Sequence, residues 1–149
     1  MVKRTDNIWL KICIGSYFEV ECLRNDYHNA IIVQDELDID RNQYILSSKK
    51  FKLVVGKTNR GKIYYYDIPE VIMDLLVQCP KNQIGCTYNY WNYNTRKIFN
   101  ELNLKQGLVN YLRICKAKWI ENLDLSVKEK EKMHSQMGHT YDTTIHNYL

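Results

Sequence analysis

The sequence lacks any long apolar run. No stretch approaches the ~20 consecutive apolar residues that a membrane-spanning helix needs, and the first six residues contain no apolar signal-peptide core. The five cysteines are an odd number and lie far apart in the chain, so they predict reduced thiols rather than a disulfide framework. These absences argue against a secreted or membrane-spanning protein and lead us to expect an intracellular one.

Proline and glycine are also scarce, with two prolines and six glycines among 149 residues. No Pro-, Gly- or Ser-rich linker, low-complexity tract or internal repeat marks a domain boundary. A chain of this length has the size of one domain, so we expect a single domain over residues 1–149. The abundance of Asn, Ile, Lys and Tyr is typical of an AT-rich genome, such as that of a virus or a parasite.

The charge is only mildly basic. The formal net charge is +4, the sequence pI is about 8.7, and charged residues make up 26% of the chain. This excess is compatible with a nucleic-acid partner, but it is equally typical of a slightly basic protein without one. Charge alone therefore does not choose between these classes.

The local patterns predict helices around a small sheet. Residues 44–66 hold short β-prone runs, and the polar turn over residues 56–61 has a glycine at each end, which predicts an antiparallel hairpin. Helices are expected from Asp67-Ile68-Pro69-Glu70, over about 93–102, from Leu108, and after the Ser126-x-x-Glu129 capping box. We expect Tyr64–Tyr66 to pack in the sheet, whereas the period before residue 32 is ambiguous. The fold class is α+β, mostly helical with a small antiparallel sheet.

The helix from Leu108 carries two features of interest. Leu108, Leu112, Cys115 and Trp119 recur at helical spacing, which predicts a stripe that faces the core. Asn110 and Arg113 are three residues apart, so we expect both to project from a neighbouring face.

The strongest chemical signal lies near the C-terminus. Gly138-His139 precedes Tyr148, which follows His139 by nine residues, with two threonines between them. This arrangement resembles the C-terminal signature of the tyrosine recombinase (phage-type integrase) family, in which a Gly-His pair precedes a nucleophilic tyrosine. Asn110-Tyr111-Leu112-Arg113, 26 residues before His139, is similar to the H-x-x-R element that carries one of the family's arginines.

The other family elements appear upstream in the same order. Lys57 lies in the predicted hairpin turn, where the family carries a lysine, and Leu23-Arg24-Asn25-Asp26-Tyr27 resembles the first-arginine box of large-DNA-virus and mobile-element integrases. The resemblance covers roughly residues 22–149. It implies a fold similar to the recombinase catalytic core, formed as a single catalytic-type domain with no separate N-terminal DNA-clamping domain.

The resemblance also implies roles for individual residues. Tyr148 would be the nucleophile, Lys57 the general acid, and His139 the base or a hydrogen-bond donor. Four residues would bind DNA phosphate: Arg24, Arg113, Asn110 and Lys62. The implied activity is integrase- or recombinase-like cleavage and rejoining of double-stranded DNA through a 3′-phosphotyrosine, with no metal or cofactor and with a homo-oligomer on DNA as a further expectation. The implied location is a host nucleus, the cytoplasm or a virion, with no membrane association.

These residue types suit phosphoryl transfer. A tyrosine with its usual pKa near ~10 is a weak nucleophile and needs in-line placement and charge stabilisation. Arginine offers a planar fork of donors to phosphate oxygens. A lysine on a turn can protonate the leaving hydroxyl group, and a histidine can accept the tyrosine proton.

The match also has departures. Asn110 replaces the histidine of H-x-x-R, so it can donate a hydrogen bond but cannot shuttle a proton. No glycine precedes Arg24, and Gly15-Ser16 is a rival position for that box, in which case the arginine is lost. Lys62 competes with Lys57 for the lysine role. Two alternatives stay open: a non-catalytic DNA-binding or virion protein that keeps the recombinase fold, and an unrelated α+β interaction module.

Overall fold

The computed structural model describes residues 6–24, 26–55, 62–80, 85–103 and 107–137. Within these ranges the chain forms two compact units, Met1–Val20 with Asp26–Trp91, and Glu21–Asn25 with Asn92–Leu149. The expectation of one catalytic-type domain stays a prediction. In chain order the described elements are α1 (Asp6–Glu19), β1 (Ile31–Val33), β2 (Gln43–Ile45), β3 (Lys50–Val54), β4 (Ile63–Asp67), α2 (Glu70–Leu76), α3 (Tyr88–Glu101), α4 (Leu108–Glu121) and α5 (Val127–Gln136).

The fold class is α+β, as expected, but the sheet is mixed rather than antiparallel. Its strand order is β1-β2-β3-β4; β1 pairs parallel to β2, and the other two pairings are antiparallel. The parallel pair was not foreseen because β1 is only three residues long. Its connection to β2 is held by the Gln43 side chain, whose amide accepts a hydrogen bond from the Leu37 N–H and donates one to the Leu37 carbonyl, both at 2.9 Å.

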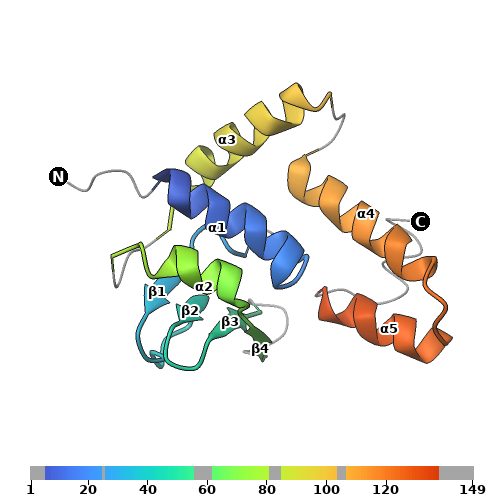
Figure 1. Ribbon diagram of the computed structural model, residues 1–149, viewed down its shortest axis with the longest axis horizontal. Helices are drawn as coiled ribbons and strands as arrows, with labels where there is room; N and C mark the ends of the chain where they lie inside the picture. Colours follow the sequence, from blue (N-terminus) through green and yellow to red (C-terminus); the bar gives the residue numbers. More distant parts are fainter. Residues whose placement is uncertain (1–5, 25, 56–61, 81–84, 104–106, 138–149) are drawn as a thin grey trace. The chain divides into compact units, whose positions relative to one another are not determined.

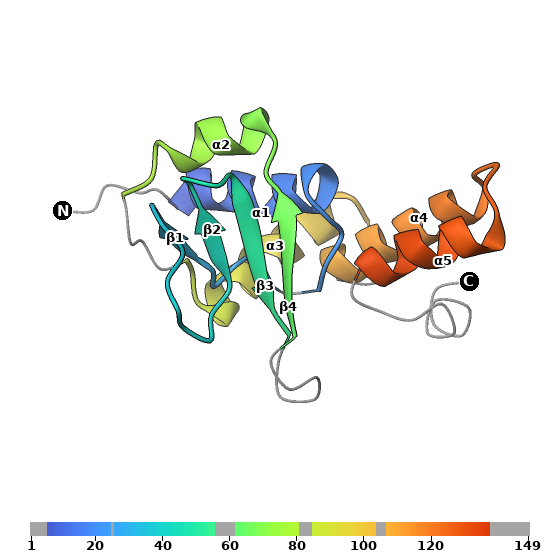
Figure 2. The same cartoon turned by 90° about the horizontal axis from the view of Figure 1, so that it is seen from below.

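The first unit has its core between α1 and the sheet, with α1 running across one face of the sheet and α2 beside α1 (Figures 1 and 2). The buried positions of α1 follow the pattern i, i+3, i+4, i+7, i+8, which is the pattern of one helix face. They are Trp9, Ile12, Cys13, Ser16 and Tyr17. The segment before residue 32, whose period was ambiguous in the sequence, therefore contains a helix. On the sheet face that α1 covers, the centroid of the Phe51 ring lies 4.8 Å from the ring centroids of both Tyr27 and Tyr44, and Tyr44 Oη lies 2.9 Å from Ser16 Oγ of α1.

The predicted hairpin is confirmed, because β3 and β4 pair antiparallel from Lys50↔Asp67 to Val54↔Ile63. The expectation that Tyr64–Tyr66 pack in the sheet is confirmed, since all three lie in β4, but Tyr64 and Tyr65 do not fill the core, because they are 42% and 49% exposed. The reason is that β4 lies at the edge of the sheet, where side chains on both faces reach solvent.

Two expected helix boundaries shift. α2 begins at Glu70 with Pro69 as its N-cap. Asp67, at which the predicted helix segment begins, instead ends β4 and pairs with Lys50. α3 begins at Tyr88 rather than near Tyr93, and the Thr87 hydroxyl accepts the Tyr90 N–H at 3.3 Å in its first turn.

In the second unit, α4 and α5 lie side by side (Figures 1 and 2). The Ser126–Glu129 capping box is confirmed: Ser126 Oγ accepts the Glu129 N–H at 3.2 Å, and the Glu129 carboxylate accepts the Ser126 N–H at 3.1 Å. In the part of the chain that the structure describes, no helix is both long enough and apolar enough to cross a membrane.

Candidate functional site

The predicted stripe of α4 faces the core only at its start. Leu108 is buried and Leu112 is half-buried, but Cys115 is exposed and Trp119 is 54% exposed, so the prediction is wrong for these last two residues. The buried residues of α4 are Leu108, Arg113, Ala117 and Ile120. The helical period was correct, but its phase was not, because the core of this unit accepts an arginine in place of an apolar side chain.

Arg113 is only 2% exposed. Its Nη1 donates hydrogen bonds to two backbone carbonyls, that of Cys22 at 2.7 Å and that of Met137 at 2.9 Å. A guanidinium that donates to carbonyls in a buried setting forms charge-assisted bonds, which are stronger than neutral ones. Arg113 therefore ties two segments that lie 91 and 24 residues away in the chain to the middle of α4.

The segment before Arg24 is held at a second point. Glu21 is 7% exposed, and its Oε1 accepts the Cys22 N–H at 3.0 Å and forms an ion pair with Lys116 Nζ. The Leu23 N–H also donates to the Glu21 carbonyl at 2.9 Å. Cys22 and Leu23 are buried, whereas Arg24 is exposed. The buried residues thus present Arg24 at the surface.

Asn110 does not share the position of Arg113. It is exposed, whereas Arg113 is buried one helical turn later. The expectation that both project from one face is wrong, because residues three apart differ by about 60° around a helix, and here the boundary of the core falls between them.

The segment before His139 is the other end of the Arg113 contact. Met137 is fully buried and caps α5, and its N–H donates to the His134 carbonyl at 3.1 Å. His134 is itself buried, with Nε2 2.9 Å from the Glu121 carboxylate. His139 follows Met137 by two positions and lies outside the described residues.

Two of the remaining predicted residues, Lys57 and Tyr148, lie outside the described residues. Lys62 is exposed just before β4 in the first unit, and its carbonyl accepts the Val55 N–H at 3.0 Å. Ser16, the rival position for the first-arginine box, is fully buried on α1, where its hydroxyl lies 2.9 Å from Tyr44 Oη. It therefore belongs to the core of the first unit.

Sequence reasoning missed Glu21 and Lys116. The sequence offered one weak signal. Glu21 lies three residues before Arg24, and Lys116 lies three residues after Arg113. Nothing in the sequence brings these two pairs together, because 95 residues separate Glu21 from Lys116.

The raised pKa values of one thiol and two tyrosine hydroxyl groups argue against these groups acting as nucleophiles. Burial raises the pKa of the Cys22 thiol to about 11, although the charges of Arg113 and Lys116 lower it in part. The thiol is therefore protonated at neutral pH and is a poor nucleophile. The pKa of the Tyr65 hydroxyl is raised by its hydrogen bond to Glu36, and that of Tyr111 is raised by its hydrogen bond to Cys115. These shifts work against either tyrosine acting as the nucleophile.

A second charged cluster lies in the first unit. Glu36 Oε2 accepts from Tyr65 Oη at 3.0 Å and lies 3.1 Å from Nζ of the buried Lys52. The pKa of the Glu36 carboxyl is lowered most by the hydrogen bond from Tyr65 and next by the hydrogen bond from Lys52. This cluster fastens the β1–β2 connection to the sheet.

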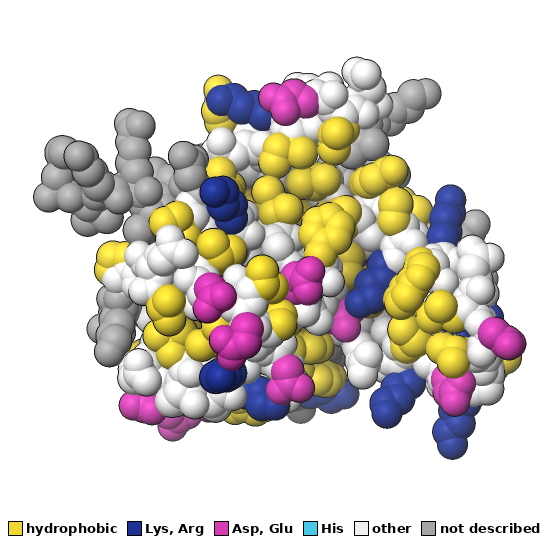
Figure 3. Space-filling model, in the orientation of Figure 1, with side chains coloured by type: hydrophobic (Ala, Val, Ile, Leu, Met, Phe, Trp, Pro, Cys, Tyr) yellow, Lys and Arg dark blue, Asp and Glu magenta, His cyan; other side chains and the backbone are white. Residues whose placement is uncertain are grey.

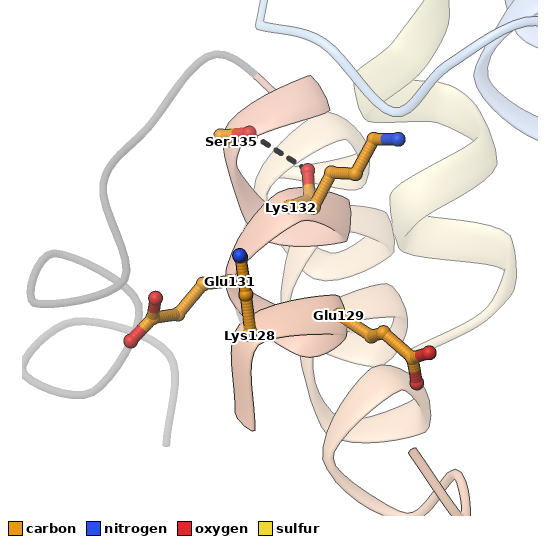
Figure 4. Close-up of a pocket in the computed structure, with 5 residues that line it drawn as sticks. All are labelled: Lys128, Glu129, Glu131, Lys132 and Ser135. Carbon is orange, nitrogen blue, oxygen red and sulfur yellow. Dashed lines mark hydrogen bonds between the residues drawn. The ribbon is translucent and has the colours of Figure 1, made fainter. Parts of the chain in front are cut away.

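A surface hollow of about 520 Å³ lies along α5 (Figure 4). The described residues that line it are Lys128, Glu129, Glu131, Lys132 and Ser135. Two lysines and two glutamates cancel in formal charge, and Ser135 Oγ donates to the Lys132 carbonyl at 2.7 Å. This lining offers no concentrated charge for a phosphate. Among the described residues, no group of His, Cys, Asp and Glu side chains is arranged to hold a metal ion.

Charge is mixed on the face drawn in Figure 3. Lysine and arginine side chains are interspersed there with acidic ones among the described residues. A mixed surface produces little long-range steering of an anionic partner.

Comparisons of the chain with protein-family models, with curated proteins and with solved structures found no match.

Proposed function

We propose that this chain cuts and rejoins double-stranded DNA through a 3′-phosphotyrosine intermediate. The observation that carries the proposal is the pair of hydrogen bonds from Arg113 Nη1 to the Cys22 and Met137 carbonyls. These bonds join three parts of the chain: the segment that leads to Arg24, the helix of Arg113, and the residue just before Gly138-His139. The guanidinium of one motif residue thus holds two backbone segments that adjoin the other motifs in the sequence, and this supports the proposal.

The proposed reaction is a transesterification. The Tyr148 hydroxyl oxygen attacks the scissile phosphorus, and its proton passes to His139. The bond from phosphorus to the 5′ oxygen breaks, and Lys57 protonates that oxygen. Rejoining runs in reverse, with the 5′-hydroxyl group as the attacking group. The phosphodiester energy is kept in the phosphotyrosine, so the step consumes no nucleotide.

The arginines would stabilise the charge that develops on the phosphate. Arg24 is exposed, as a residue that meets DNA must be. Arg113 would contribute a fixed positive charge, and Asn110 and Lys62 would contact neighbouring phosphates. Well-placed donors of this kind are worth about 3–4 kcal/mol each by analogy with oxyanion holes.

The test is a covalent trap. The protein is incubated with a duplex nicked close to the cleavage point, so that the fragment carrying the 5′-hydroxyl group diffuses away and the adduct accumulates. Because the target sequence is unknown, the duplexes are drawn from a randomised library. We expect an adduct that survives denaturing electrophoresis, is lost in Tyr148→Phe and persists in the matched control Tyr141→Phe. Loss in both variants, or persistence in both, contradicts the assignment of Tyr148.

A second candidate is a non-catalytic DNA-binding protein. Two observations favour it: the 2% exposure of Arg113, whose Nη1 is engaged by carbonyls, and the replacement of the motif histidine by Asn110. This candidate predicts duplex binding that is unchanged in Tyr148→Phe, with no covalent product from any duplex in the library.

A further inference from the structure

We infer that Glu21 and Lys116 are positioning residues for Arg24; this inference rests on the proposed function. Lys116 lies one turn after Arg113 on α4, and each of the two cations holds the segment before Arg24. Arg113 Nη1 binds the Cys22 carbonyl at 2.7 Å, and Lys116 Nζ pairs with the Glu21 carboxylate. Two adjacent residues of the segment are thus anchored to one helix.

The Glu21 carboxylate also fixes the local backbone. Its Oε1 accepts the Cys22 N–H at 3.0 Å in addition to the ammonium group of Lys116. Together with the bond from the Leu23 N–H to the Glu21 carbonyl at 2.9 Å, this sets the path of the chain up to Leu23. The path determines where the next residue, the exposed Arg24, leaves the buried segment.

Burial makes this anchor more rigid than a surface ion pair. The side chain of Glu21 is 8% exposed and that of Lys116 is 25% exposed, so water competes weakly for either charge. Exposed pairs lose much of their attraction to solvent and to side-chain entropy. A rigid anchor suits a phosphate contact, because a misplacement of about 1 Å can slow a reaction roughly a hundredfold.

The Glu21–Lys116 pair does not itself need to meet DNA. Glu21 would repel a phosphate, and Lys116 is already paired with a carboxylate. We therefore expect their effect on the reaction to pass through Arg24. This requirement separates a positioning role from direct binding and from general support of the fold.

The test is a double-mutant cycle with Arg24. The variant Glu21→Gln/Lys116→Met removes both charges together, so no unpaired charge is left buried, and the glutamine oxygen can still accept the Cys22 N–H. The cycle compares wild type, this variant, Arg24→Ala and the combination of both. Controls are Glu19→Ala and Lys118→Met, two exposed residues close in sequence to the pair, and Lys116→Arg, which keeps the ion pair. Melting temperatures are measured for all of them.

Two readouts are taken on the same proteins: the single-turnover rate of adduct formation, and the duplex affinity as a function of salt. We expect the neutral pair to slow adduct formation roughly tenfold in a chain that melts as one folded species, and to have no further effect once Arg24 is alanine. The salt slope should become about 0.9 shallower, as for the loss of one phosphate contact, in the neutral pair and in Arg24→Ala alike. Lys116→Arg and the two exposed controls should behave as wild type.

Multiplicative losses in the combined variant would overturn the inference, because Glu21 and Lys116 would then act independently of Arg24. An unchanged rate and salt slope in the neutral pair would overturn it as well. A wild-type chain that binds duplex DNA without forming an adduct contradicts the proposed reaction, while the salt-slope cycle still decides the positioning role. A chain that neither binds nor cleaves DNA contradicts both.

Discussion

Replacing Arg113 by methionine should loosen α4 and α5 and destabilise the second unit. The change keeps an unbranched side chain, although a shorter one, and removes the donor to the Cys22 and Met137 carbonyls. A hydrogen bond from a charged donor contributes about 1.5–3 kcal/mol, and a buried carbonyl left without a donor costs about 1–3 kcal/mol. The two figures are alternative estimates for the same two hydrogen bonds, so they are not added. For two bonds we expect a loss of about 3–5 kcal/mol in the free energy of unfolding.

Urea unfolding followed by circular dichroism measures this loss. With a slope of about 1–3 kcal/mol per molar urea, the midpoint should fall by about 1–5 M. Hydrogen exchange gives the location, since the amides of α4 and α5 should exchange faster while those of β2 and β3 in the first unit stay protected. Arg113→Lys should lose less, because an ammonium group keeps one charged donor but not the planar fork.

The matched control is Arg96→Met, which changes an exposed arginine on α3. It should move stability by less than about 0.5 kcal/mol. Equal midpoints for the Arg113 and Arg96 variants, or unchanged exchange in α4 and α5, would refute the anchoring role derived from the two carbonyl contacts.

Two further predictions concern the first unit. Gly85→Ala should cost more than about 2 kcal/mol in thermal unfolding, because the added Cβ would lie 2.0 Å from the His28 carbonyl oxygen; Gly107→Ala, with nothing within 4 Å of its Cβ, should cost less than about 1 kcal/mol, and equal costs would contradict the packing. Tyr65→Phe should raise the Glu36 pKa in an NMR titration, since the hydrogen bond from Tyr65 is the largest of the effects that lower it. Because the folded pKa lies below the ordinary value, Glu36 contributes stability above that ordinary value, and this contribution is lost as pH falls through the folded pKa; an unchanged Glu36 pKa in the variant would show that the bond does not form in solution.

The buried arginine bears on both candidate functions. If the chain cleaves DNA, Arg113 joins the motif segments, so its loss should reduce activity and stability together. If the chain only binds DNA, the same loss should reduce stability while leaving an exposed residue such as Arg24 to contact phosphate. Adduct formation measured beside the urea midpoint distinguishes the two cases.

Short-range patterns were sufficient for several elements. The hairpin of β3 and β4 was predicted because β-prone runs flank a glycine-bounded turn, and α5 because Ser126 and Glu129 satisfy each other's backbone N–H groups. Both depend on residues close together in sequence, so neighbouring side chains determine them. α4 was predicted by its helical period for the same reason.

Other features could not be derived in this way. In α1 the apolar residues Ile8, Leu10 and Ile14 are half-buried and Phe18 is 66% exposed, so apolar residues surround the helix and the sequence does not reveal which face is buried. In α4 the apolar stripe pointed to the wrong phase, because Trp119 is exposed and Arg113 is buried. Which face of such a helix is buried can be assigned only when the elements that pack against it are known.

The sequence by itself determined the α+β class, the hairpin, the capping box and the order of the motif residues along the chain, since all of these follow from local chemistry. The tertiary structure alone decided that β1 runs parallel to β2, that Arg113 lies in a core, and that Glu21 meets Lys116 across 95 residues. The physical reason is that a buried charge is stable only where distant carbonyls or an opposite charge converge on it. Such convergence is a property of the folded chain as a whole.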